Sequence, residues 1–338
     1  MLWLSYRQFR AQAAAGLLLT AASLGYLLYF GLALRTQQQS VLEHCRPTGS
    51  CTSELAQFAA QHENPLLFLA TGLYLVPVTI GMFWGAPLIS TELENGTHRF
   101  IWNQGVTRTG WLLGRLAVPA ATAVLLTGAL SAAMTWATSP VDQIANDKFS
   151  AILFGARDLA PVGYALLAVT LGALTGAVTR RRLPAMAAFA AIFLALLFAF
   201  PNLVRPHLLP VERESRPMTA PAINAARSMG SITGAARVGG LQVPNAWVSS
   251  TSDLLTSNGT PLSTREFNRC YSNAPDTGAE GTFGDVAVCL AKLDLHVDIE
   301  YQPNSRYWAF QLMELLAFAG AAGVAAASAA RYLRHRIT

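Results

Sequence analysis

Residues 92–104 read Glu92-Leu93-Glu94-Asn95-Gly96-Thr97-His98-Arg99-Phe100-Ile101-Trp102-Asn103-Gln104. This polar stretch lies between two apolar runs, Pro65–Ile89 and Trp111–Trp136, each longer than the roughly 20 residues that a helix needs to cross a bilayer. It therefore predicts a loop at a membrane surface. Its mixture of charged and aromatic residues is typical of an amphipathic element that docks into a partner protein. An interfacial helix with Trp102 at the lipid headgroups is the simpler interpretation, and both stay open.

The composition also indicates a membrane protein. Of the 338 residues, 52% are hydrophobic and 13% are charged, whereas a soluble domain carries about 25% charged residues. The net charge of +5 does not indicate nucleic-acid binding, because the basic residues flank apolar segments.

Six apolar stretches are long enough to span a bilayer, so we expect an all-α polytopic membrane protein. No cleavable signal peptide is predicted, because the first apolar run is too long for the apolar core of one. The predicted spans are Ala11–Leu34, Pro65–Ile89, Trp111–Trp136, Asp158–Thr179, Leu183–Phe200 and Tyr307–Ala330.

The basic residues of the short connections predict the orientation, because Arg and Lys accumulate on the cytoplasmic side. Eleven fall on one side: Arg7, Arg10, Arg99, Arg108, Arg115, Arg180, Arg181, Arg182, Arg331, Arg334 and Arg336. Four fall in the short loops of the other side: Arg35, Arg46, Lys148 and Arg157. We therefore expect both termini in the cytoplasm, which six spans allow.

The connection before the last span differs in composition. It is rich in Pro, Gly, Ser, Thr and Asn, and it is expected outside the cell membrane. The expected parts of the chain are residues 1–200 with five spans and a coupling loop at 90–111, residues 201–306 as an extracytoplasmic domain, and residues 307–338 as the sixth span with a basic cytoplasmic tail.

Local patterns predict a small ordered α+β fold for this extracytoplasmic insertion. Ser263, with Glu266 three residues later, is typical of a helix cap, and the alternation in Leu293–Ile299 is typical of a half-buried strand. Other expected elements are helices at Ala222–Met229 and Asp285–Leu293 and extended chain at Pro244–Val248. Such a cap would be a structural lid, or it would shield the exit of a pathway or hold a substrate.

All four cysteines, Cys45, Cys51, Cys270 and Cys289, fall in connections expected on the oxidising side, which favours two disulfides. Three pairings are open. We favour Cys45–Cys51 and Cys270–Cys289, because each pair closes a local loop. A metal site with His44 is the competing interpretation, but the wide spacing resembles no compact zinc motif, so no metal is predicted.

The sequence carries no catalytic constellation. It contains no His-Glu-x-x-His motif, and without a Gly-x-x-x-x-Gly-Lys motif it lacks the P-loop that binds ATP. We therefore expect neither an enzyme nor a bound cofactor. Glu314 lies within the last apolar run, with Gln311 one turn earlier. A charge at the bilayer centre costs about 2.5–3.5 kcal/mol, so Glu314 should face protein, water or an arginine. It either lines a pathway with Gln311 or has a structural role.

Three segments resemble permease subunits of type-2 ABC exporters, especially those of actinobacteria. Residues 92–111 follow that group's pattern Glu-x-x-x-Gly-Thr-His-Arg, then Trp-x-Gln, Thr-Arg and Trp. Residues 301–311, with Glu314 and the Arg-rich C-terminus, resemble its entry into the last span. The N-terminal residues Trp3, Tyr6, Arg7 and Arg10 are similar to its amphipathic elbow helix.

The resemblance implies six spans, an external elaboration before the last one, and a cytoplasmic coupling region between the second and third. Two permease copies would pair, and two separate ATPase subunits would bind ATP and Mg²⁺. The implied partners also include membrane lipids but no nucleic acid, and the implied location is the bacterial cytoplasmic membrane. The coupling residues would be Glu92, Glu94, Gly96, Thr97, His98, Arg99, Phe100 and Trp102.

The leading hypothesis is therefore the transmembrane subunit of an ATP-driven exporter. Spans built mostly of Ala, Leu and Gly suit a hydrophobic or amphipathic substrate such as a drug, lipid or peptide. The alternative is a non-transporting sensor, immunity or mechanotransmitting subunit that binds an external peptide through residues 201–306. An intramembrane enzyme is the third hypothesis, and the missing catalytic residues argue against it.

Overall fold

The computed structural model describes residues 2–45, 51–97, 107–145, 148–231, 234–241, 243 and 245–336. It divides into two compact units. The helical unit comprises Met1–Leu208 and Trp308–Thr338, and the smaller unit comprises Leu209–Tyr307.

Six helical segments of the described residues are long and apolar enough to cross a membrane, which agrees with the predicted number. A helix bonds most of its backbone polar groups internally, as an apolar surrounding requires. The segments are Phe9–Cys45, Gln57–Glu94, Arg108–Ile144, Ala160–Thr179, Arg182–His207 and Asn304–Arg336. They are built from α1 (Leu2–Cys45), α2 (Thr52–Tyr74), α3 (Val76–Ile80), α4 (Ala86–Glu94), α6 (Arg108–Ala145), α8 (Ala160–Thr179), α9 (Arg182–Ala199) and α13 (Tyr307–Arg336).

The connection between the first two spans is more helical than expected. The predicted spans end at Leu34 and begin again at Pro65, whereas α1 continues to Cys45 and α2 starts at Thr52. The charge of Arg35 is accommodated because its guanidinium lies 3.8 Å above the Trp136 ring. The same guanidinium donates hydrogen bonds to the Gly31 and Trp136 carbonyls at 2.8 and 2.6 Å. The two helices therefore extend beyond the ends of the apolar runs, Leu34 and Pro65, by which the spans were predicted.

The second span contains a π-helical turn, η2 (Gly81–Gly85), between α3 and α4. A π turn holds an extra residue and changes the direction in which the following side chains point. Helix α8 packs directly against this turn. A Cβ on Gly172 of α8 would lie 2.7 Å from the Ala86 nitrogen and 2.8 Å from the Gly81 carbonyl oxygen, so glycine is needed for this close approach.

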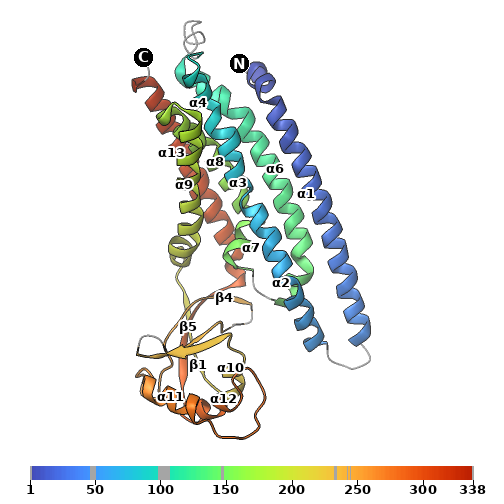
Figure 1. The fold of residues 1–338 in the computed structure, drawn as a ribbon, viewed down its shortest axis with the longest axis vertical. Helices are drawn as coiled ribbons and strands as arrows, with labels where there is room; N and C mark the ends of the chain where they lie inside the picture. Colours follow the sequence, from blue (N-terminus) through green and yellow to red (C-terminus); the bar gives the residue numbers. More distant parts are fainter. Residues whose placement is uncertain are drawn as a thin grey trace. The chain divides into compact units, whose positions relative to one another are not determined.

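Helices α8 and α9 are joined by a very short connection. Helix α8 ends at Thr179 and α9 begins at Arg182. Arg180, at a φ of 56°, adopts the left-handed conformation that reverses the chain. After α9 the chain continues through a π turn, η3 (Phe200–Val204), and a 3₁₀ turn, η4 (Arg205–His207). Within the helical unit, both ends of the chain and the C-terminal end of α4 lie at the same end of the bundle (Figure 1).

The smaller unit is an α+β fold with its own core. Its three-stranded antiparallel sheet has the order β1-β5-β4, and a second sheet pairs β2 with β3. Val297 and Ile299 of β5 are fully buried, as the alternation in this segment predicts. The strands are β1 (Glu212–Pro217), β2 (Ser228–Ser231), β3 (Ala236–Gly239), β4 (Ala246–Thr251) and β5 (His296–Pro303).

The described residues of the smaller unit also form the short α-helices α10 (Ala220–Asn224), α11 (Thr264–Ser272) and α12 (Gly284–Ala291). Ser263 caps α11: its hydroxyl accepts a bond from the Glu266 nitrogen at 3.3 Å and donates one to the Glu266 carboxylate at 2.9 Å. The helix expected at Ala222–Met229 is wrong in its second half, where Ser228 begins β2 and pairs with Gly239. Pairing with the neighbouring strand β3 overrides the helical preference there.

The structure joins Cys45 to Cys51 and Cys270 to Cys289, with Cα–Cα distances of 5.3 and 5.5 Å. These are the two pairs favoured from the sequence. The first joins the end of α1 to the residue before α2, and the second joins α11 to α12. Each pair therefore fastens two neighbouring helices of its own unit.

Candidate functional site

The last turns of α4 carry a buried carboxylate that pairs with α6. Glu92 accepts a hydrogen bond from the Arg115 guanidinium at 2.6 Å, and each of the two side chains is 12% exposed. Thr97, in the turn after α4, donates its hydroxyl to the other oxygen of the same carboxylate. Glu92 therefore connects the end of α4, the start of α6 and the turn that follows α4.

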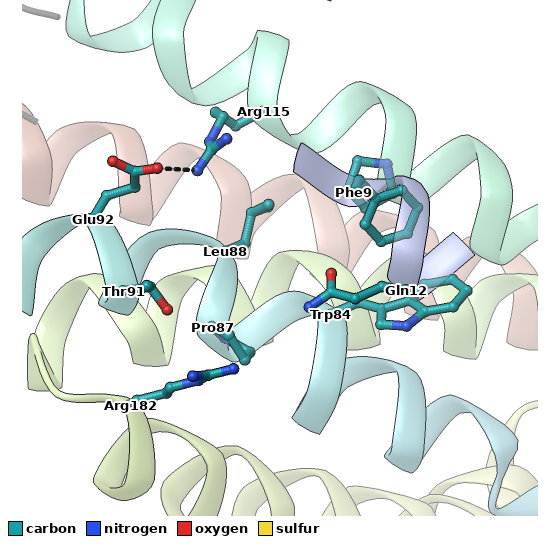
Figure 2. Close-up of a pocket in the computed structure, with 10 residues that line it drawn as sticks. Phe9, Gln12, Trp84, Pro87, Leu88, Thr91, Glu92, Arg115 and Arg182 are labelled. Carbon is teal, nitrogen blue, oxygen red and sulfur yellow. Dashed lines mark hydrogen bonds and ion pairs between the residues drawn. The ribbon is translucent and has the colours of Figure 1, made fainter. Parts of the chain in front are cut away.

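This ion pair forms part of the wall of a cavity of about 240 Å³ (Figure 2). Phe9 and Trp84 lie on its apolar side, with ring centroids 4.9 Å apart and the rings edge to face. Figure 2 shows Arg182 beside Pro87, across α4 from the Glu92–Arg115 pair. The cavity is lined by Phe9, Gln12, Trp84, Pro87, Leu88, Thr91, Glu92, Arg115, Pro119 and Arg182.

Hydrogen bonds tie several helix ends together at this end of the helical unit. The Arg182 backbone nitrogen, at the start of α9, donates to the Glu94 carboxylate at 3.0 Å. Arg108 of α6 donates to the Leu333 and Arg334 carbonyls of α13 at 2.9 and 3.0 Å. A cation is favourable at a helix C-terminus, where carbonyl groups lack intrahelical partners. A displacement of the turn after α4 would therefore reach α6 and α9 directly.

Four of the expected coupling residues lie in the described part of the chain. Glu92 and Glu94 belong to the end of α4, whereas Gly96 and Thr97 form the turn after it. Gly96 has a φ of 71°, a conformation that favours glycine after a helix end. The expected residues His98, Arg99, Phe100 and Trp102 lie outside the described residues.

The expected elbow residues belong to the first turns of α1. The backbone is helical without a break from Leu2, so these turns continue into the spanning helix and do not form a separate one. Arg10 is exposed. Trp3, Tyr6 and Arg7 have side chains outside the part of the structure that is described.

A second polar cluster lies inside the helical unit, around Glu314 of α13. The Arg205 guanidinium donates two hydrogen bonds to its carboxylate, from Nε to Oε2 and from Nη2 to Oε1, each at 3.0 Å. Both side chains are 0% exposed. Tyr164 of α8 donates its hydroxyl to Glu314 Oε1. A buried charge needs such partners, because an unpaired one is strongly destabilising.

Gln311, one turn before Glu314, is also fully buried. Its Oε1 accepts hydrogen bonds from the backbone nitrogens of Leu159 and Ala160 at 3.0 and 2.9 Å, at the start of α8. Its Nε2 donates to the Phe154 carbonyl at 3.1 Å. The contacts of Gln311 and Glu314 are therefore those of residues that hold α13 against α8. Their role in a pathway stays a prediction.

Sequence patterns did not assign three residues to these clusters: Arg205, Tyr164 and Arg115, which was counted only as a basic residue near a span end. Arg205 lies five residues after Phe200, the predicted end of the fifth span, and the sequence places it in the external segment that begins at residue 201. In the structure the fifth helical segment continues to His207, so Arg205 lies inside the helical unit. One signal in the sequence could have suggested that Arg205 pairs with Glu314: each is a charged residue within or close to a long apolar run.

The apolar helical segments and the tied helix ends define a multi-pass membrane protein with a polar turn at the end where both termini lie. The family model described as ABC-2 membrane transporter related matches residues 17–205. The chain belongs to this family of permease-like membrane components, which associate with an ATPase subunit. Neither the curated proteins nor the solved structures gave a match to this chain.

Proposed function

We propose that the protein is the transmembrane permease subunit of an ATP-driven exporter in the bacterial cytoplasmic membrane. Two copies pair, each engages one of two ATPase subunits that bind ATP and Mg²⁺, and both termini lie in the cytoplasm. The substrate is a hydrophobic or amphipathic molecule such as a drug, lipid or peptide. Family membership supports the permease role, and the observation that carries the coupling proposal is the Glu92–Arg115 pair.

The pair supports coupling because it fixes the turn at which an ATPase would act. Glu92 accepts a hydrogen bond from Thr97 of that turn, and Arg115 belongs to the next spanning helix. A push on the turn would therefore displace α4 and α6 together. The cytoplasmic contact surface of the ATPase would include the remaining residues of the loop, His98, Arg99, Phe100 and Trp102.

Close packing provides a route from this turn to the opposite end of the spans. The start of α4 lies against α8 at Gly172, where no Cβ fits. Helix α8 also carries Tyr164, which bonds to Glu314 of α13. Because packed backbones and buried hydrogen bonds resist deformation, movement of α4 would shift α8 and, through it, the environment of Glu314.

The test uses the full chain reconstituted with its ATPase subunits in lipid nanodiscs. The variants Glu92→Arg and Arg115→Glu each place two like charges against each other. We therefore expect each variant to lose most of the permease's stimulation of ATP hydrolysis. The double variant restores an ion pair of reversed direction and should regain stimulation. Glu43→Gln, an exposed carboxylate of α1, is the control. Normal stimulation in both single variants would refute the coupling proposal.

The smaller unit favours one alternative function. It has its own buried core and an internal disulfide, so it is built to keep a fixed surface. A sensor, immunity or mechanotransmitting subunit would use that surface to bind an external peptide. Substrate-dependent flux measured in proteoliposomes separates the hypotheses: ATP hydrolysis without flux would favour the alternative.

A further inference from the structure

The start of α9 carries arginines that face a groove beside α4. Arg182 lines both the cavity of about 240 Å³ and a neighbouring one of about 860 Å³, and Pro87 and Thr91 are shared as well. The two cavities therefore meet at these three residues. The larger one is lined by Phe83, Pro87, Thr91, Glu94, Asn95, Arg181, Arg182, Leu183, Pro184 and Met186.

The guanidinium groups in this groove are available to a ligand. Arg181 and Arg182 are exposed, and in the described part of the chain neither side chain makes a hydrogen bond or an ion pair (Figure 2 shows Arg182). Arg115 is already neutralised by Glu92. The Glu94 carboxylate accepts a hydrogen bond from the Arg182 backbone nitrogen. The two cavities are lined by three arginines (Arg115, Arg181 and Arg182) and two carboxylates (Glu92 and Glu94), so their net charge is +1.

The walls around these arginines include large apolar side chains. Phe83 is 55% exposed and Leu183 is 77% exposed, and Trp84 and Phe9 line the smaller cavity. A site with arginines at a helix start and large exposed apolar side chains next to them suits an amphipathic anion. Helix α9 starts at Arg182 and its apolar run starts at Leu183, so the arginines lie at the membrane boundary, where lipid headgroups lie.

We propose that this groove binds an anionic glycerophospholipid of the membrane. Arg182, with Arg181 beside it, holds the phosphodiester, because a guanidinium matches phosphate oxygens with two parallel donors. The acyl chains lie against Phe83 and Leu183. The single net positive charge of the groove fits one phosphodiester, and the backbone bond from Arg182 to Glu94 keeps the site in place next to α4.

The test measures lipid retention on the purified full chain by native mass spectrometry. The probes are phosphatidylglycerol, phosphatidylcholine of the same acyl chains, and glycerol 3-phosphate as a soluble anion. We expect the wild type to retain phosphatidylglycerol about tenfold better than phosphatidylcholine, which corresponds to about 1.4 kcal/mol. Arg182→Gln with Arg181→Gln should remove this preference.

Arg331→Gln is the matched control, because Arg331 is an exposed arginine near the end of α13 that lines neither cavity. It should keep the preference. A thermal unfolding midpoint without added lipid shows whether each variant folds, and Arg182→Lys should retain part of the preference if folding is unharmed. Equal retention of both lipids by the wild type, the same loss in Arg331→Gln, or binding of glycerol 3-phosphate as tight as that of the lipid would each overturn the proposal.

Discussion

The carboxylate of Glu314 accepts two hydrogen bonds from the guanidinium of Arg205, although the two residues are 109 positions apart in the chain. Nearly all of the intervening chain, Leu209–Tyr307, forms the smaller unit. The ion pair therefore joins the point where the chain leaves the helical unit to the point where it returns. It holds together the two chain segments, before Leu209 and after Tyr307, that connect the helical unit to the smaller unit.

We expect the removal of one partner of this pair to destabilise the helical unit. Arg205→Met leaves Glu314 buried without its cation, and such a loss typically costs about 3–5 kcal/mol. The thermal unfolding midpoint of the full chain in detergent should fall clearly. The double variant Arg205→Met with Glu314→Met leaves no buried charge, so it should be more stable than Arg205→Met alone. If Arg205→Met and the double variant unfold at the same temperature, the charge of Glu314 does not depend on Arg205 for its stability, and the prediction is wrong.

The contact between α4 and α8 predicts a difference between two glycines. Gly172→Ala places a methyl group against the Ala86 and Gly81 backbone atoms, and overpacking of this kind costs about 1–3 kcal/mol. Gly320→Ala in α13 meets nothing within 4 Å in the described structure, and alanine is the better helix former by about 1 kcal/mol. Unfolding midpoints should therefore fall for the first variant and stay equal or rise for the second. Equal midpoints would contradict the close packing.

The proposed orientation predicts that both disulfides are reached only from outside the cell. A membrane-impermeant maleimide should label Cys45, Cys51, Cys270 and Cys289 on intact cells, and only after reduction. Arg331→Cys, placed in a chain whose native cysteines are replaced by serine, tests the other side of the membrane. It should stay unlabelled until the cells are lysed. Labelling of Arg331→Cys on intact cells would mean that the chain is inverted.

Acid should weaken the smaller unit through Asp285. The Thr277 hydroxyl donates a hydrogen bond to its carboxylate and lowers the pKa of Asp285 below its usual value of 3.8, with backbone bonds from Thr277 and Ala279 acting in the same direction. A carboxyl whose pKa is lower in the folded state stabilises the fold above its unfolded pKa. That contribution is lost as the pH falls through the folded pKa.

The measurement is the thermal unfolding midpoint of the full chain, monitored by intrinsic fluorescence. It is repeated from about pH 6 down to about pH 3, the range in which carboxyl groups usually titrate. The decline should be smaller for Asp285→Asn than for the wild type. Asp276→Asn, which removes an exposed carboxylate nearby, should behave like the wild type. A parallel decline in the Asp285 variant would exclude this carboxyl as the cause.

The spans were predictable because apolarity over about 20 residues is a strong local signal. The Ser263 cap and the β5 alternation are local signals of the same kind. The pairing of Glu314 with Arg205 was not predictable: an isolated carboxylate in an apolar run requires a partner, but its position does not say which arginine supplies it. Strand β1, with four charged residues among its six, shows no apolar alternation and is defined by its pairing with β5. Both contacts join distant parts of the chain.

The connection between α8 and α9 has a consequence for how the protein reaches its membrane. Only Arg180 and Arg181 separate the two helices, and two residues are too few to let one helix cross while the other waits in water. We therefore expect the two helices to lie in the lipid together as one hairpin. Three consecutive arginines at its tip resist passage through the bilayer, so we expect the tip to stay on the side from which the hairpin enters.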